Sequence, residues 1–202
     1  MNEPAPINKR KGANLPHWTR DGANYAVTFR LADSLPQAAV EKLRAEERQL
    51  DRQQSRGYVP MSREEERRFA QLKSEEYQHL LDDGYGECVL KRDDAAEIVA
   101  KALKHFEGIR YRLWAWCVMP NHVHAAVQVF EPHTLSSVLH SWKSFSAKEV
   151  NKVLGRTGVF WQAESYDHLI RDEAEFQHCV KYILENPAKA GLASWKWVGS
   201  LV

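Results

Sequence analysis

Two histidines, His122 and His124, stand one residue apart at the start of a run of β-forming residues. Side chains alternate between the two faces of a strand, so both imidazoles are expected on one face and Val123 on the other. Val127 and Val129 share the parity of Val123, which is the alternation of a strand with one face in the core. Two imidazoles placed in this way either bind one divalent metal ion or are simply polar residues on a solvent-exposed face.

A second stretch, residues 176–187, has helical periodicity. Tyr182 and Asn186 lie four residues apart, and therefore on one face of the expected helix. The amide oxygen of asparagine is an acceptable ligand for a hard metal ion, and a tyrosine one turn earlier would lie beside the same ion. The apolar stripe of the helix is offset from that face and consists of Phe176, Val180, Ile183 and Leu184.

The motifs Met119-Pro-Asn-His-Val-His124 and Tyr182-Ile-Leu-Glu-Asn186-Pro-Ala-Lys-Ala-Gly-Leu192 occur together in this chain. In combination they resemble the HUH single-strand DNA transposases with one catalytic tyrosine. They are most similar to the branch called REP-associated tyrosine transposases, relatives of the IS200/IS605 enzymes. Shorter stretches that also resemble this branch are Pro16-His-Trp18, Thr28-Phe-Arg-Leu-Ala-Asp-Ser-Leu-Pro36 and Asp167-His-Leu-Ile-Arg171.

The resemblance implies a metal site for Mg²⁺ or Mn²⁺ formed by His122, His124 and the side-chain oxygen of Asn186. It also implies that Tyr182 is the nucleophile, forming a 5′-phosphotyrosine and releasing a 3′-OH. A phenol has an unperturbed pKa near 10, so this tyrosine needs a nearby cation or base. The residues expected to support the site, by bracing it or by touching DNA, are Asp167, His168 and Arg171.

Basic side chains gather near the N-terminus and on the helix expected after Thr134. Such clusters suit phosphate contacts, although a basic tail can equally be a solvated arm. Lys181 and Lys189 flank the tyrosine and either hold phosphate or belong to the plain surface. The candidate DNA-binding residues are Arg10, Lys11, His17, Trp18, Arg20, Lys143, Lys181 and Lys189.

The expected elements predict an α+β fold in a single domain spanning residues 1–202. By resemblance, this is a ferredoxin-like, RRM-like antiparallel sheet with helices on one face. Residues 1–15 are expected to be an irregular, mobile, basic arm, and residues 37–83 a charged helical insertion with helices at 38–53 and 62–81. The other expected strands lie at 25–31, 111–118, 158–162 and 166–170, and one more begins at 122. The other expected helices are one at 94–106, one that begins at 135 and one that ends at Pro187.

Two aromatic features leave choices open. Trp114 and Trp116 are expected on one face of their strand, either in the core or as platforms for base stacking. The C-terminal tail from Trp195 either docks on the core or packs over DNA. On the helix after Thr134, the residues expected on the inner side are Leu135, Val138, Leu139, Trp142 and Phe145.

The composition excludes several classes of protein. The chain has 44% hydrophobic residues and a net charge of +1, which argues against disorder, and no apolar run long enough to span a membrane. Its three cysteines are scattered without a CxxC pair, which argues against a disulfide framework and a thiolate zinc site. We therefore expect a cytoplasmic protein with no membrane partner.

The leading hypothesis is a metal-dependent endonuclease and strand transferase acting on single-stranded DNA with hairpins of the REP type, as a monomer or homodimer. The alternative is a non-catalytic single-stranded nucleic-acid binding module on the same fold. A third possibility is a metal-dependent hydrolase that uses water instead of Tyr182. A covalent protein–DNA adduct distinguishes the first from the third.

Overall fold

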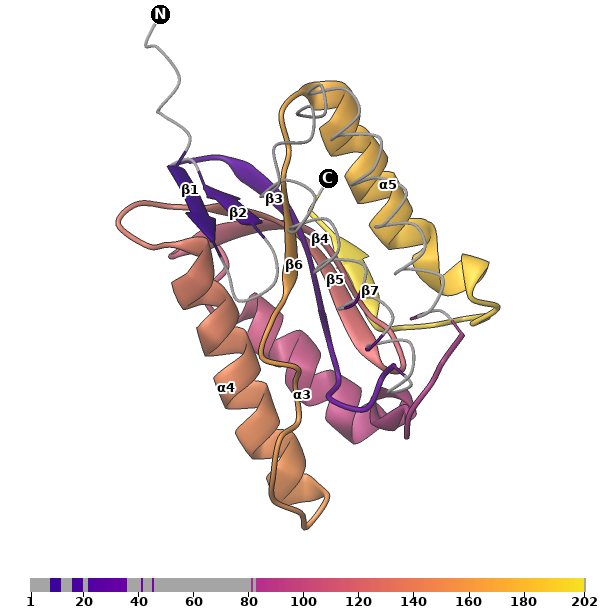
Figure 1. Ribbon diagram of the computed structural model, residues 1–202. Helices are drawn as coiled ribbons and strands as arrows, with labels where there is room; N and C mark the ends of the chain where they lie inside the picture. Colours follow the sequence, from indigo (N-terminus) through magenta and orange to yellow (C-terminus); the bar gives the residue numbers. More distant parts are fainter. Residues whose placement is uncertain are drawn as a thin grey trace, which may run out of the picture. The chain divides into compact units, whose positions relative to one another are not determined.

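The computed structural model describes residues 8–11, 16–19, 22–35, 41, 45, 81 and 83–201. The chain divides into two compact units, residues 1–32 with 89–202 and residues 33–88. No helix in the described part of the chain is long and apolar enough to cross a membrane. The first unit contains all the strands and helices described below (Figure 1).

The main sheet has five antiparallel strands in the order β6-β3-β5-β4-β7. α3 (Asp93–Lys104) lies between β3 and β4 in the chain, and α4 (Leu135–Val153) lies between β5 and β6. The order is therefore β-α-β-β-α-β, the ferredoxin-like arrangement, and the α+β prediction is confirmed. The strands are β3 (Asn24–Arg30), β4 (Tyr111–Val118), β5 (His122–Val129), β6 (Tyr166–Leu169) and β7 (Val198–Ser200).

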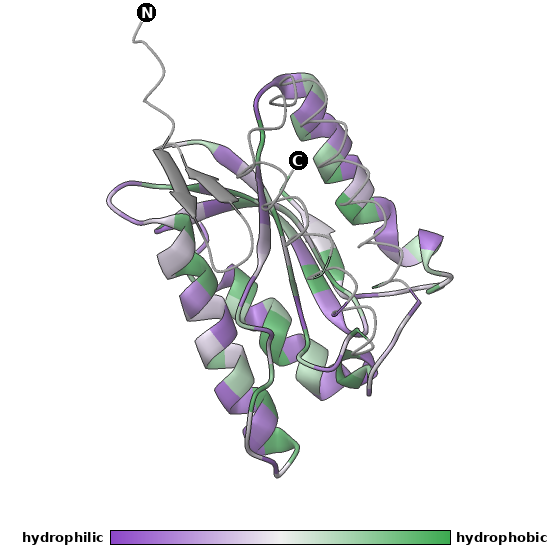
Figure 2. Ribbon diagram, viewed as in Figure 1, coloured by the Kyte–Doolittle hydropathy of each residue, from purple (hydrophilic) through white to green (hydrophobic). Residues whose placement is uncertain are grey.

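The sheet separates two apolar clusters. Val123, Val127 and Val129 of β5 join the larger cluster with the inner sides of α3 and α4. Ala126 of β5 belongs to the smaller cluster, with residues of α5 (Glu173–Lys189) such as Ile183. The helices were expected on one face of the sheet; α3 and α4 lie there, whereas α5 covers the other face. Both hydropathy colours run along α4 and α5, as expected for helices with one apolar side (Figure 2).

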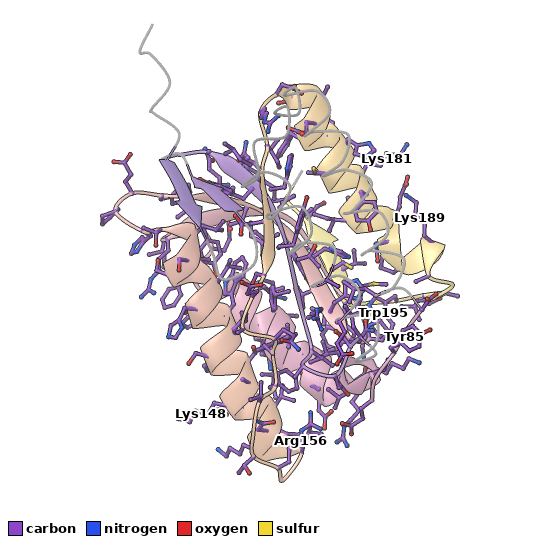
Figure 3. The ribbon with its side chains drawn as sticks, viewed as in Figure 1. Tyr85, Lys148, Arg156, Lys181, Lys189 and Trp195 are labelled. Carbon is purple, nitrogen blue, oxygen red and sulfur yellow. The ribbon has the colours of Figure 1, made fainter. Side chains whose placement is uncertain are left out.

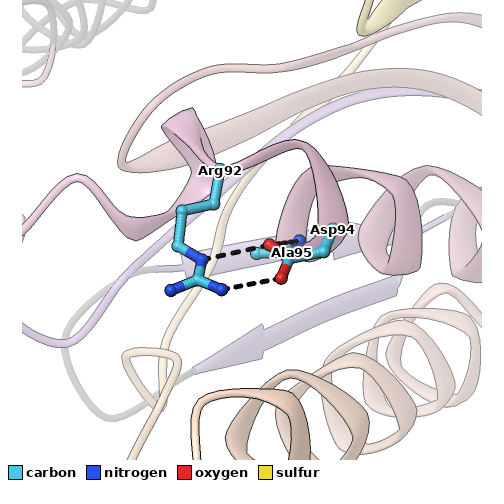
Figure 4. Close-up of polar contacts among 3 residues, drawn as sticks. All are labelled: Arg92, Asp94 and Ala95. Carbon is cyan, nitrogen blue, oxygen red and sulfur yellow. Dashed lines mark hydrogen bonds and ion pairs between the residues drawn. The ribbon is translucent and has the colours of Figure 1, made fainter.

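The helices begin at identifiable signals. Thr134 caps α4, and its hydroxyl accepts a hydrogen bond from the Ser137 backbone in a reciprocal capping box. α3 has no side-chain cap at its first position. Instead the carboxylate of Asp94 accepts from the Ala95 amide at 2.8 Å and from the Arg92 guanidinium at 2.7 and 3.1 Å (Figure 4). A carboxylate in the first turn also suits the positive end of the helix dipole.

A β-bulge in β4 separates the two tryptophans that were expected on one face. The pairing with β5 shifts between Leu113 and Ala115, which adds one residue to β4. Trp114 therefore packs with the α5 side, at 5.6 Å from the ring of Phe176, while Trp116 packs with the larger cluster. The prediction of a shared face was wrong because a single inserted residue reverses the alternation.

The C-terminal tail docks on the core, which decides a question that the sequence left open. β7 pairs with β4 at the edge of the sheet. The indole of Trp195 donates to the Val118 carbonyl at 2.7 Å, and that of Trp197 donates to Asp93 at 3.1 Å. The tail thus covers the edge of β4, which would otherwise present unpaired backbone groups.

Three expectations about local structure were wrong. Residues 1–15 contain the strand β1 (Asn8–Lys11), which pairs with β2 (Pro16–Thr19) in a separate two-stranded sheet. Residues 158–162 contribute only an isolated bridge from Trp161 to Leu31 instead of a strand. Helix α5 continues past Pro187 to Lys189, because proline costs a helix one backbone donor but its fixed φ remains helical.

Phe145 was expected on the inner side of α4, but its side chain is 52% exposed. Ser146 occupies the inner position next to Trp142. The serine hydroxyl donates to the Trp142 carbonyl at 2.6 Å and accepts from the Trp161 indole at 2.9 Å. A polar residue was favoured there because it satisfies a buried indole N–H, which phenylalanine does not.

The unit 33–88 contains the predicted insertion 37–83, whose two expected helices lie outside the described residues apart from three helical positions, 41, 45 and 81. Its two ends meet, since Glu87 donates its amide to the Asp33 carboxylate at 2.8 Å. Gly86 is required at this contact, because a Cβ would lie 2.6 Å from the Asp33 carbonyl oxygen. The flanking residues of the first unit bond to one turn: Leu31 donates to the Asn121 carbonyl at 2.9 Å and Leu90 to that of Pro120 at 3.1 Å.

Candidate active site

The histidine pair lies on the face of β5 that α5 covers. His122 is fully buried and His124 is 2% exposed, so the solvent-exposed alternative is wrong. The two Nε2 atoms lie 2.9 Å apart. Each ring uses its other nitrogen in a second hydrogen bond, His122 with Asn121 Oδ1 at 2.7 Å and His124 with Thr28 Oγ1 at 2.8 Å. Two buried partners, Thr28 on β3 and Asn121 in the turn before β5, therefore fix both rings together with the contact between the rings.

Burial also keeps the two imidazoles neutral. It lowers the pKa of His124 to about 3. Burial, with the neighbouring His124 as a smaller cause, lowers the pKa of His122 well below its ordinary value of 6.5. Neutral imidazole is the form that binds metal ions, because a protonated ring has no lone pair to offer.

Helix α5 brings Tyr182 to the histidine pair. The ring of Tyr182 stands edge-on to that of His124, with 5.6 Å between the ring centres. Its side chain is only partly buried. The predicted cap of this helix is confirmed, since the Asp172 carboxylate accepts from the Glu175 amide at 2.9 Å.

Asn186 lies one turn beyond Tyr182 on α5, as the spacing predicts, and is 1% exposed. Its side-chain oxygen has no hydrogen-bond partner within the described structure. A buried carbonyl oxygen without a partner is costly unless something else satisfies it. In the described part of the chain no cluster of three or more His, Cys, Asp or Glu side chains can hold a metal ion. Two neutral imidazoles and one unsatisfied amide oxygen nevertheless fit a divalent cation such as Mn²⁺.

The three supporting residues have different positions. His168 lies on β6, and its Nε2 is 2.8 Å from the Glu175 carboxylate, which also accepts from the Arg171 amide at 2.7 Å. This contact ties β6 to the first turn of α5 and so braces the helix that carries Tyr182. Asp167 pairs with Val27 in the strand register, which places it on the α3–α4 face of the sheet.

The candidate phosphate-binding lysines are mostly engaged with other groups. On α5, the ammonium of Lys181 is 3.8 Å and that of Lys189 is 3.3 Å from the Glu185 carboxylate. Lys189 also lies 5.3 Å from the centre of the Tyr182 ring. Both side chains project outward along α5 (Figure 3). On α4, Lys143 donates to the Ala163 carbonyl at 2.8 Å, and burial lowers its pKa to about 8.

Four of the five N-terminal candidates fall in the two-stranded sheet. Arg10 pairs with His17, and Lys9 pairs with Trp18, in the register of β1 and β2. Lys11 lies opposite Pro16 in the same register. Arg20 lies outside the described residues. The pairing brings four of the five candidates together on one hairpin, and their contact with DNA stays a prediction.

Three residues at the site were missed from the sequence. Thr28 and Asn121 hold the histidine rings, and Arg30 is a buried cation, 9% exposed, that pairs with His122 in the register of β3 and β5. The register of two antiparallel strands would have identified Thr28 and Arg30, because cross-strand neighbours share one face. That register depends on a long-range pairing that a single sequence does not specify.

Parts of this sequence match a known protein family and a curated relative. The family model described as Transposase IS200 like matches residues 84–186, just over half of the chain. The REP-associated tyrosine transposase of Escherichia coli strain K12 is 28% identical over 81 residues, which covers 40% of this chain and 47% of that protein. The match thus spans about half the length of the curated relative, and it confirms the resemblance to the REP-associated branch.

Two solved structures are similar at lower identity. One is a REP-associated tyrosine transposase bound to a REP hairpin, with 16% identity, a TM-score of 0.49, and coverage of 95% of this chain and 81% of that chain. The other is a putative transposase from Deinococcus radiodurans R1, with 13% identity, a TM-score of 0.39, and coverage of 88% and 96%. The residues matched by this family model include His122, His124, Tyr182 and Asn186 of this chain. On that match, the chain belongs to the IS200-like transposase family.

Proposed function

We propose that this protein is a metal-dependent endonuclease and strand transferase for single-stranded DNA, which cuts beside hairpins through a 5′-phosphotyrosine on Tyr182. The proposal rests on the contact between Tyr182 and His124, whose ring centres lie 5.6 Å apart. At the same place the Nε2 atoms of His122 and His124 point toward each other. A nucleophile beside two neutral nitrogen ligands suits phosphoryl transfer.

The residues that would hold Mg²⁺ or Mn²⁺ are His122, His124 and Asn186. When bound, such an ion neutralises charge on the non-bridging oxygens of the phosphodiester and polarises the phosphorus. The imidazoles favour Mn²⁺, whereas the Asn186 oxygen suits either ion.

Tyr182 supplies the nucleophile. Its phenolic oxygen attacks phosphorus, an O–P bond to tyrosine forms, and the bond from phosphorus to the 3′ oxygen breaks. The phenolic proton passes to solvent, and the released 3′ oxygen takes one up as a 3′-OH. Because phosphorus exchanges its ester bond to the 3′ oxygen for one to tyrosine, the bond energy is retained. A second 3′-OH can therefore attack the phosphotyrosine and rejoin DNA without ATP.

Two cations lie near the reacting groups. Lys189 stands over the Tyr182 ring, and a nearby cation favours the ionised, nucleophilic phenol. Arg30 is the partner of His122 on the neighbouring strand β3, and its guanidinium geometry suits a phosphate group. We assign DNA with REP-type hairpins as the substrate, by similarity to the relative whose structure holds a REP hairpin.

The test uses single-stranded hairpin DNA from the same genome, labelled at either end, with Mn²⁺ and the full-length protein. We expect a denaturant-resistant adduct on the 5′ end of the 3′ fragment. Tyr182→Phe should abolish the adduct, whereas Tyr85→Phe, at an exposed tyrosine, should retain it. Chelation of Mn²⁺ should also abolish it.

The other outcomes decide against this proposal. Cleavage without an adduct, unchanged in Tyr182→Phe, would identify a hydrolase that uses water. Binding without cleavage under any metal ion would identify the non-catalytic binding module.

A further inference from the structure

The two imidazoles are held by partners of different chemistry. Asn121 Oδ1, which bonds His122 Nδ1 at 2.7 Å, can only accept a hydrogen bond. Thr28 Oγ1, which bonds His124 Nδ1 at 2.8 Å, is a hydroxyl that can donate or accept. Both partners are buried, with Asn121 1% and Thr28 6% exposed. Each bond is therefore shielded from exchange with bulk water.

This difference fixes the protons on the two rings. Because Asn121 accepts, the Nδ1 of His122 carries the hydrogen, and its Nε2 has a lone pair. The 2.9 Å contact between the two Nε2 atoms needs one hydrogen, which His124 must then supply. The Nδ1 of His124 is consequently the acceptor, and the Thr28 hydroxyl donates to it.

Metal binding requires lone pairs on both Nε2 atoms. His122 already has one, but His124 obtains one only when its hydrogen moves from Nε2 to Nδ1. The Thr28 hydroxyl must then turn from donor to acceptor, with no change in the total number of protons.

We propose that Asn121 and Thr28 are positioning residues with different roles in cation binding. Asn121 holds His122 permanently in the form that binds a cation, whereas Thr28 lets His124 change between bonding His122 and binding the cation. The inference rests on the proposed function, because it takes the histidine pair as the metal site.

The first experiment measures Mn²⁺ binding to the DNA-free protein by electron paramagnetic resonance. Thr28→Val keeps the shape of the side chain but removes the hydroxyl, so we expect affinity to fall about 10- to 100-fold, the usual cost of losing such a partner. Thr28→Ser keeps a hydroxyl and should bind within about threefold of wild type. Asn121→Leu should weaken binding similarly, and thermal melting checks that each variant is folded.

The second experiment needs no variant. Long-range ¹H–¹⁵N correlation spectra of the wild-type imidazoles report which nitrogen carries hydrogen, with Zn²⁺ as a diamagnetic probe. Without metal, we expect hydrogen on Nδ1 of His122 and on Nε2 of His124. With Zn²⁺, the hydrogen on His124 should be at Nδ1, while His122 is unchanged.

The possible failures are distinguishable. If wild type binds neither Mn²⁺ nor Zn²⁺, the metal site of the proposed function is wrong, and this inference with it. If wild type binds but Thr28→Val binds equally well, or the hydrogen on His124 does not move, only the roles of Thr28 and Asn121 are overturned.

Discussion

At the scale of single residues, burial keeps the histidine pair neutral over a wider range of pH than exposed histidines. An exposed imidazole is half protonated near pH 6.5 and then loses its lone pair. Burial lowers the pKa of His124 to about 3 and that of His122 well below 6.5, so both stay neutral in mildly acidic solution. For the proposed cation site, this means that neither imidazole has to lose a net proton before an ion binds in mildly acidic solution.

Lys189 offers a prediction about the nucleophile. Replacing Lys189 with Met removes the cation 5.3 Å from the Tyr182 ring centre. Because that cation favours the ionised phenol, the rate of adduct formation should fall about tenfold at neutral pH, while Lys189→Arg stays close to wild type. Quenched single-turnover reactions measure the rate.

Lys181→Met is the matched control for Lys189. Both lysines pair with Glu185, but the Tyr182 ring contact in the described structure is made by Lys189. Equal losses in Lys181→Met and Lys189→Met would mean that general surface charge, and not the cation beside the phenol, sets the rate.

At the scale of elements, helix α4 contains a half-buried lysine, Lys143, whose contribution to stability depends on pH. Burial lowers the pKa of Lys143 from 10.5 to about 8, opposed by nearby Glu164. Between these values the unfolded chain holds a proton that the folded protein lacks, so stability rises with pH in this window. Above about pH 10.5 both states are neutral and the rise ends.

Lys143→Met should show this effect as a difference. The free energy of unfolding of wild type, minus that of the variant, should increase from pH 8 to pH 10.5, measured by urea denaturation. Lys148→Met, at an exposed lysine on the same helix, should show no such trend. A flat difference for Lys143 would mean that its ammonium stays solvated in the folded protein.

The elements also show how far sequence patterns reach. β4 has the predicted bounds, Tyr111–Val118, because alternation and β-forming residues mark it clearly. The bulge at Trp114 could not be predicted, since one extra residue leaves no local signal. β7 was missed because its stability comes from pairing with β4, a long-range contact. Likewise, the shared face of Tyr182 and Asn186 could be predicted from helical spacing, whereas the position of Thr28 beside His124 depends on the strand register.

At the scale of the whole molecule, a net charge of +1 conceals an uneven availability of positive charge. The lysines of α5 share one carboxylate, Glu185. Lys148 and Lys152 of α4 are exposed and form no ion pair among the described residues. Figure 3 shows Lys148 and Arg156 toward the end of α4, far along that helix from its cap. Helix α4 therefore carries two lysines without an ion-pair partner among the described residues, and Phe145 on the same helix is also exposed.

If DNA contacts this side of α4, salt dependence should report it. Lys148→Gln and Lys152→Gln should each lower the slope of log affinity against log salt by about 0.7 for single-stranded DNA. Lys101→Gln is the control, because Lys101 is already paired with Glu97 at 2.8 Å. Fluorescence anisotropy between low and moderate salt measures the slopes, and unchanged slopes in all three variants would place the DNA elsewhere.

The attachment of the unit 33–88 has a consequence for how this protein can evolve. The chain leaves at Leu31 and returns at Leu90, and both residues are hydrogen-bonded to the turn formed by Pro120 and Asn121. Lengthening a segment between fixed ends adds little entropic cost, because that cost grows only with the logarithm of its length. Selection can therefore enlarge, shorten or exchange the sequence between these anchors while the strand that begins at His122 keeps its register.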